Sequence, residues 1–235
     1  MAAAKYVGNI IGNLMISIHE KRHISTKNMI LLPHSLGSHV SGYAAKTVKQ
    51  VLPRIARIIA MDPAGPRWVN KPCDKRLCKT DADVVEVLHT DVGGLGYEAP
   101  LGTIDFYANG GSNQSGCDSP EASKEFACSH CRSWAYVIEA IKHPNHFISE
   151  NCNDWKTYQE KKKRCGNMSI ALGDLEAKEG GVYYFKTHNK SPFAMENGEE
   201  EDSSGLASIT RSSGLLIFIS LVLLKIKSIN IKQTL

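Results

Sequence analysis

Apolar residues recur along the first part of the chain with the spacing of helices and strands. Seven of them predict an amphipathic helix, because they lie three or four residues apart: Tyr6, Val7, Ile10, Ile11, Leu14, Met15 and Ile18. A short apolar run over residues 28–32 predicts a buried strand. After a turn around Ser35, apolar positions between residues 40 and 51 return at helical spacing and predict a second helix.

The same alternation continues through the middle of the chain. Residues 54–61 read as a strand that ends at Asp62 and Pro63, and residues 84–88 and 104–107 read as two more. A helix is expected just after His130, and residues 182–185 predict a last strand. Strands that alternate with helices at these distances predict an α/β fold with a mainly parallel sheet.

The composition changes from about residue 195. An acidic, turn-rich stretch, "ENGEEEDSSG", has the character of a linker, and an apolar run follows from Leu215 to Leu224. That run is half of the ~20 residues that cross a bilayer as a helix. The chain is therefore divided into a main domain, residues 1–196, and a linker with a short tail, residues 197–235. Small residues before the apolar run are also typical of a lipid-anchor signal, so membrane attachment by this tail stays an alternative.

Charge and cysteine content narrow the class of protein. The net charge of +4 is too small to indicate a nucleic-acid partner. Seven cysteines, most of them close together in pairs, favour an oxidising, extracellular compartment. Cys128 and Cys131 have C-x-x-C spacing, but no second pair completes a zinc site. The start, "MAAAKYVGNI", lacks the pattern of a signal peptide, so we expect an incomplete N-terminus.

The stretch "LLPHSLGSHVSGYAAK" departs by one residue from G-x-S-x-G, the strand–turn–helix motif of a nucleophilic serine. Ser35 and Gly37 are in place, but Pro33 occupies the first glycine position. Such a serine needs a base and an acid that orients the base, in the chain order Ser, Asp, His. Asp62 directly follows a strand and is the candidate acid.

Four later histidines qualify by position as the base: His89, His130, His143 and His146. His130 is preferred, because it lies where a loop meets a helix. His89 is expected to be a structural histidine, and His143 and His146 flank Pro144 in a predicted surface turn. His39 lies one helical turn past Ser35 and is expected to pack or to hydrogen-bond there.

Five motifs in order then identify a resemblance: "HSLGSHVSGYAAK", "MDPAGP", "CDKRLCKTDADVVEVLHTD", "IDFYANGG" and "CSHCRSW". From about residue 6 to residue 194 the chain resembles the pancreatic-type lipase family, in its branch of insect lipases and venom-type phospholipases A1. The resemblance implies an α/β-hydrolase fold. It also implies Ser35 as nucleophile, Asp62 as acid and His130 as base, with the backbone N–H of Leu36 as one oxyanion donor. No metal or cofactor is implied.

Three disulfides follow from the same resemblance: Cys73 with Cys78, Cys117 with Cys128, and Cys152 with Cys165. Short loops, and too few residues after residue 194 for an extra β-sandwich, favour a phospholipase A1 that acts at the sn-1 position of phosphatidylcholine-type lipids. A triacylglycerol lipase is one alternative. A catalytically inactive, lipid- or partner-binding relative is the other.

Three departures from the family bear on activity. Pro33 fixes φ and removes an N–H, so we expect a displaced Ser35 or a cost of a few kcal/mol. Relatives carry preceding strands and a loop with the second oxyanion donor, which this chain is expected to lack. The nucleophile strand is then expected near a sheet edge. Cys131, directly after the candidate base, has no local partner.

Overall fold

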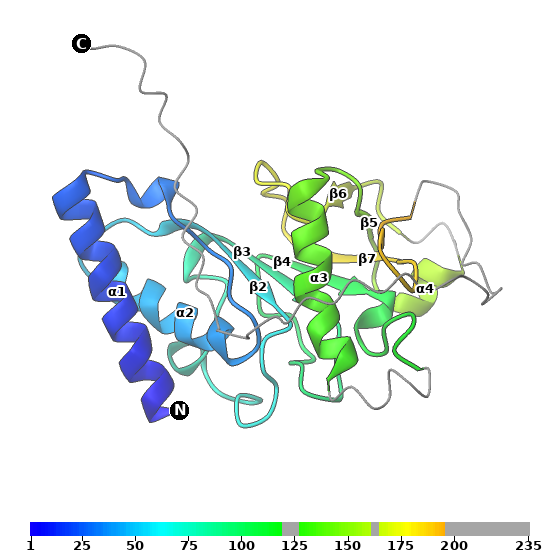
Figure 1. Cartoon of the computed structure of the whole chain (residues 1–235), viewed down its shortest axis with the longest axis horizontal. Helices are drawn as coiled ribbons and strands as arrows, with labels where there is room; N and C mark the ends of the chain where they lie inside the picture. Colours follow the sequence, from blue (N-terminus) through cyan, green and yellow to red (C-terminus); the bar gives the residue numbers. More distant parts are fainter. Residues whose placement is uncertain (119–126, 161–164, 196–235) are drawn as a thin grey trace, which may run out of the picture.

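The computed structural model describes residues 1–118, 127–160 and 165–195, and within them one sheet organises the chain (Figure 1). Its strands are β1 (Ile30–Leu31), β2 (Ile55–Met61), β3 (Ala82–His89), β4 (Ile104–Ala108), β5 (Ile148–Asn151), β6 (Ser169–Ala171) and β7 (Gly181–Phe185). Their order is β1-β2-β3-β4-β7-β5-β6. The first five in this order are mutually parallel, and β5 runs antiparallel to both of its neighbours. The prediction of an α/β fold with a mainly parallel sheet is confirmed.

Strands β2 and β3 are rich in β-branched residues and are buried on both faces, as parallel strands between helices are. Successive side chains of a strand point to opposite faces. On β3, Val85 and Val87 join one hydrophobic core, while Val84 and Leu88 join the other. The sheet therefore separates two cores.

Helices cover the two faces. Helices α1 (Ala2–Arg22) and α2 (Leu36–Val48) share the core of Val85, whereas α3 (Cys128–Lys142) packs Tyr136 and Val137 into the core of Leu88. Figure 1 shows α1 lying alongside α2, with α3 over the middle of the molecule. The remaining helices are short: α4 (Trp155–Gln159) and the 3-10 turns Thr26–Asn28, Cys73–Lys75 and Asn109–Gly111.

Two glycines let α1 approach α2 closely. A Cβ on Gly8 would lie 2.5 Å from the Cβ of Tyr43, and one on Gly12 would lie 2.6 Å from the Cβ of Thr47. Real carbon atoms keep about 3.5–4.0 Å apart, so only glycine fits this crossing. Because Met15 lies on the same side of α1 and is fully buried, the glycine face is the one that packs.

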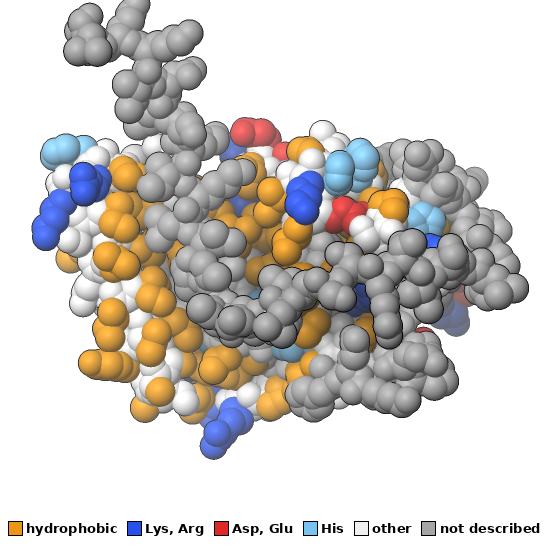
Figure 2. Space-filling model, viewed as in Figure 1, with side chains coloured by type: hydrophobic (Ala, Val, Ile, Leu, Met, Phe, Trp, Pro, Cys, Tyr) orange, Lys and Arg blue, Asp and Glu red, His pale blue; other side chains and the backbone are white. Residues whose placement is uncertain are grey.

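The helix predicted from the spacing of apolar residues is present, but its packed face differs from the apolar set. Tyr6, Val7, Ile10 and Leu14 are between 44% and 69% exposed. Figure 2 shows hydrophobic side chains gathered along the outer side of α1, on the left of the view. Apolar spacing predicted the helix correctly, while the glycines decided which side faces α2.

Two other expectations need correction, and three short elements were not expected. Helix α3 begins at Cys128, so His130 lies in its first turn and not before it. The first three residues of the helix, Cys-Ser-His, do not show the apolar spacing of a helix. Ala127 before them has no side chain that could cap the helix and mark its start. Residue 51 lies past the end of α2 and is exposed. Strands β5 and β6 and helix α4 were not predicted, because their short sequences, ISEN, SIA and WKTYQ, contain no continuous apolar run.

Glu139 on α3 anchors the last described segment. Its Oε1 accepts hydrogen bonds from the backbone N–H groups of Phe193 (2.6 Å) and Ala194 (2.9 Å), and its Oε2 accepts one from Ser191 Oγ at 3.0 Å. The predicted linker and the run from Leu215 to Leu224 lie outside the described residues. Among the residues that are described, no helix is both long and apolar enough to cross a membrane.

Candidate active site

Ser35 lies at the tight turn between β1 and α2. Its backbone has φ 55° and ψ −126°, a conformation that side-chain-bearing residues rarely adopt. The turn is held from both sides: Ser35 N–H donates to the carbonyl of Met61 (2.9 Å), and Met61 N–H donates to the carbonyl of Pro33 (2.8 Å). Leu36 is the first residue of α2, so its N–H has no partner within the helix. This is the geometry of a nucleophile turn with an amide donor beside it.

Pro33 shortens β1 without shifting the register. Ile30 lies opposite Arg57 and His34 lies opposite Met61, which is one continuous alignment. That alignment directs the N–H of residue 33 at the carbonyl of Ile59, and proline has none to give. The strand is therefore interrupted after Leu31, while the serine beyond it keeps its hydrogen bonds to β2.

Asp62 and His130 form a buried hydrogen-bonded pair. His130 Nδ1 donates to Asp62 Oδ2 at 2.5 Å, and the side chains are 6% and 0% exposed. Asp62 Oδ1 accepts hydrogen bonds from the backbone N–H groups of Thr90 (2.8 Å) and Asp91 (3.2 Å). The bond to Asp62 places the His130 proton on Nδ1, which leaves Nε2 able to accept a proton.

The turn that carries Ser35 contacts this pair through the preceding residue. The ring of its neighbour His34 lies 4.5 Å from the ring of His130, and His34 Nε2 is 3.2 Å from the carbonyl oxygen of His130. Among the described residues, no hydrogen bond joins Ser35 Oγ to His130 Nε2. Catalytic bonds of this kind are often long without substrate and tighten in the complex.

The remaining histidines have other surroundings. His89 is buried between the carbonyl of Tyr97 (2.8 Å) and Asp105 Oδ1 (2.9 Å), as expected of a structural histidine. His39 is fully buried, stacks on Trp68 at 4.0 Å and hydrogen-bonds the carbonyl of Ala64. Burial lowers the pKa of His39 to about 4, so its ring is neutral at pH 7. His143 and His146 are exposed and stacked, in the expected surface turn.

Two features of the site escaped sequence reasoning. The amide donors of Thr90 and Asp91 reach Asp62 only because β2 and β3 are adjacent, which no local pattern reveals. His34 was overlooked although it directly precedes the candidate nucleophile. Its position in the motif was the available signal.

The cysteines pair as the resemblance implies: Cys73 with Cys78, Cys117 with Cys128, and Cys152 with Cys165. Cys131 is free and half-buried. The disulfide to Cys128 ties the first residue of α3 to the preceding loop, two residues before His130. It therefore constrains the start of the helix that carries the candidate base.

Two groups of metal-ligating side chains occur in the described parts of the chain. Asp62, Asp91 and His130 have ligand atoms within 4.8 Å of one another, but Asp62 and His130 already share a proton. The other group contains Cys152 and Cys165, whose sulfurs are joined as a disulfide and so offer no thiolate. A hydrogen bond in the first group and a disulfide in the second therefore already use these ligand atoms.

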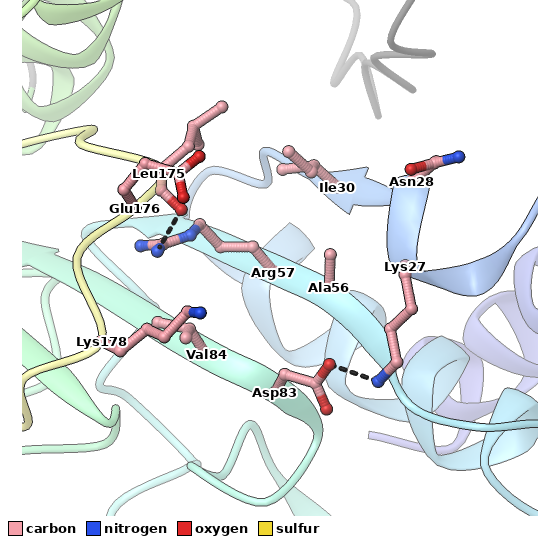
Figure 3. A pocket seen from close by; sticks show the side chains of 10 residues that line it. All are labelled: Lys27, Asn28, Ile30, Ala56, Arg57, Asp83, Val84, Leu175, Glu176 and Lys178. Carbon is pink, nitrogen blue, oxygen red and sulfur yellow. Dashed lines mark hydrogen bonds and ion pairs between the residues drawn. The ribbon is translucent and has the colours of Figure 1, made fainter.

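A cavity of about 240 Å³ lies at the ends of the strands that are far from Ser35 and Asp62 (Figure 3). Lys27 and Asp83 are ion-paired at its rim, and Arg57 crosses it to reach the carbonyl of Leu175. It opens near the starts of β2 and β3, whereas Asp62 follows the end of β2. Its lining includes no serine, histidine or cysteine, so it offers no nucleophile and base.

The parallel sheet, the serine turn after β1 and the buried carboxylate–imidazole pair are together the features of an α/β-hydrolase fold. The lipase family model matches residues 1–193, and the chain belongs to that family. It is 37% identical over 199 residues to phospholipase A1 of Vespa crabro and 36% identical over 197 residues to phospholipase A1 VesT1.02 of Vespa tropica. Each match covers 83% of this chain and 64% of the relative.

A shorter match, 42% identical over 139 residues, links the chain to phospholipase A1 1 of Dolichovespula maculata. It covers 59% of this chain and 43% of that protein. The chain thus spans less than two thirds of the length of the wasp and hornet relatives that it matches.

Proposed function

We propose that this chain carries the catalytic residues of a lipid ester hydrolase of the phospholipase A1 type. The observation that carries the proposal is the buried hydrogen bond between His130 and Asp62 beside the strained turn of Ser35. The printed names of the relatives support a phospholipid as the substrate. The three cysteine pairs support an extracellular location.

The reaction proceeds in two displacements. His130 Nε2 accepts the proton of Ser35 Oγ as that oxygen attacks the carbonyl carbon of the sn-1 ester. The N–H of Leu36 donates to the oxyanion that forms, and a donor of this kind contributes about 3 kcal/mol. His130 then protonates the leaving glycerol oxygen, and the acyl group remains on Ser35. Water, deprotonated by His130, releases the fatty acid and restores the serine.

Asp62 has a supporting role. It fixes the tautomer of His130 and stabilises the imidazolium that forms when the serine gives up its proton. The amide donors of Thr90 and Asp91 hold its carboxylate in place while this happens.

The test uses the whole chain, with its disulfides formed, and phosphatidylcholine in mixed micelles with different labels on the two acyl chains. Release of the sn-1 label alone is expected, with loss of at least ~10³-fold in Ser35→Ala and in His130→Ala. Ser112→Ala, at an exposed serine, is the matched control. A fluorophosphonate probe should also label Ser35 covalently without any lipid.

Each other outcome has a meaning. Equal release of both labels would reject sn-1 preference, and faster release from triacylglycerol would favour the triacylglycerol lipase. A folded chain that neither turns over lipid nor reacts with the probe would be a non-catalytic lipase relative. Circular dichroism of every variant establishes that it is folded.

A further inference from the structure

We infer that His34 is a positioning residue for the base, which holds the first turn of α3 and the ring of His130 in register with Ser35. The inference rests on the proposed function. His34 acts through its contact with His130 and takes no part in the bonds that form and break.

The first observation is the contact across the two elements. His34 ends the β1 side of the nucleophile turn, and His130 lies in the first turn of α3, 96 residues later. His34 Nε2 is 3.2 Å from the carbonyl oxygen of His130. Because a carbonyl oxygen only accepts, His34 must carry its proton on Nε2 and donate it. Ser133 Oγ donates to the same carbonyl oxygen at 2.7 Å, so two hydrogen bonds, one of them from His34, hold the backbone of the residue that bears the base.

The second observation is the ring contact. The centroids of the two imidazoles are 4.5 Å apart with an interplanar angle of 46°. Asp62 holds His130 at Nδ1, and His34 packs against its ring, so the imidazole is held by two groups. A base supported in this way loses little orientational freedom when it accepts the serine proton, and such placement is worth a large factor in rate.

The third observation is electrostatic. Burial lowers the pKa of His34, and the nearby His130 lowers it further. His34 is therefore neutral at pH 7, and it adds no positive charge next to an imidazole that must become cationic. In the described parts of the chain, the carboxylates of Asp62, after the end of β2, and Asp91, in the loop after β3, also face this pair.

Three substitutions test separately what the aromatic ring, the N–H donor and the neutral charge of His34 contribute. His34→Phe keeps an aromatic ring and removes the donor, and His34→Gln keeps an N–H donor and removes the ring. We expect kcat to fall about 10- to 100-fold in each, with KM nearly unchanged. His34→Lys puts a permanent charge beside His130, and it should lower the apparent pKa of the acid limb of kcat/KM by about one unit. His146→Gln, at an exposed histidine, is the control and should leave both readouts unchanged.

The same variants are followed with the fluorophosphonate probe between pH 5 and 9. If the unsubstituted chain neither reacts nor hydrolyses lipid, the proposed function has failed and the role of His34 with it. If the unsubstituted chain reacts, and the folded His34 variants match it in kcat and in their acid limb, the positioning role alone is overturned. A fall in kcat with an unmoved acid limb in His34→Lys would also reject the placement of His34 against the base.

Discussion

The close crossing of α1 over α2 predicts that a glycine-to-alanine substitution changes the stability of the protein in the direction opposite to the usual one. Replacing glycine by alanine inside a helix normally stabilises it by about 1 kcal/mol. At Gly12 the added Cβ would lie 2.6 Å from the Cβ of Thr47 and 2.7 Å from the carbonyl oxygen of Ala44. To reach an ordinary contact the helices must separate by about 1 Å. We therefore expect Gly12→Ala to destabilise the protein.

The magnitude follows from two opposing effects. Overpacking costs about 1–3 kcal/mol, and a gap near 1 Å weakens the packing of the fully buried Met15 on the same face. Subtracting the gain of about 1 kcal/mol in helix propensity leaves a net loss of up to about 2 kcal/mol in the free energy of unfolding, to which the weaker packing of Met15 adds. Urea unfolding followed by circular dichroism measures it as a lower midpoint with an unchanged m value.

Asn13→Ala is the matched control, because Asn13 is the exposed neighbour on the same helix. It should raise the free energy of unfolding by about 0.5 kcal/mol, since alanine has the higher helix propensity and meets nothing there. The two neighbouring alanine substitutions should thus have opposite signs. A Gly12→Ala protein that is more stable than the original would refute the close crossing.

Three further predictions concern other parts of the fold. Pro33→Ala supplies the N–H that faces the Ile59 carbonyl; we expect a change in stability below about 1 kcal/mol, because the new hydrogen bond is offset by a more flexible unfolded chain. Hydrogen exchange should find that amide protected, and a rapidly exchanging amide would contradict the inferred register. Glu139→Ala leaves the buried N–H of Phe193 and the half-buried N–H of Ala194 without their acceptor and should cost about 2–4 kcal/mol, whereas Glu139→Gln keeps an acceptor and should cost less than about 1 kcal/mol in the same urea assay. Equal losses in both would show that the carboxylate charge matters more than the acceptor. His39 takes up a proton at a pKa of about 4 when folded but near 6.5 when unfolded, so the unfolded chain binds more protons between these pH values. Stability should fall as the pH drops from 6.5 to 4, by up to about 3 kcal/mol, and the fall should be smaller in His39→Asn; identical pH profiles would exclude this origin.

Much of the central fold could be predicted from the sequence. The long buried strands β2 and β3 have continuous β-branched runs, and α1 has a clear helical period, so local pattern and tertiary structure agree there. Strands β5 and β6 are stabilised by antiparallel pairing with residues far along the chain, and their short sequences carry no comparable signal. The strand predicted over residues 28–32 is reduced to Ile30–Leu31, because Pro33 lacks the N–H that the pairing requires.

The candidate site divides in the same way. Ser35 and Asp62 could be chosen because each follows a strand, and His130 because it lies where a loop was expected to meet a helix. The support around them could not be predicted. Thr90 and Asp91 reach Asp62 only once the strands are adjacent, and His34 meets His130 only when α3 lies against the turn. These contacts join distant parts of the sequence, and no local period marks them.

The division of the interior into two cores has a consequence for how the protein would lose its proposed activity. Ser35 introduces the helix that belongs to one core, and His130 belongs to the helix of the other. Heat or mild denaturant that lets one layer slide by about 1 Å over the sheet would separate Ser35 from His130 while every helix stays folded. Inactivation should then precede the loss of secondary structure on heating. The distance between Ser35 and His130 therefore depends on the alignment of the two helical layers.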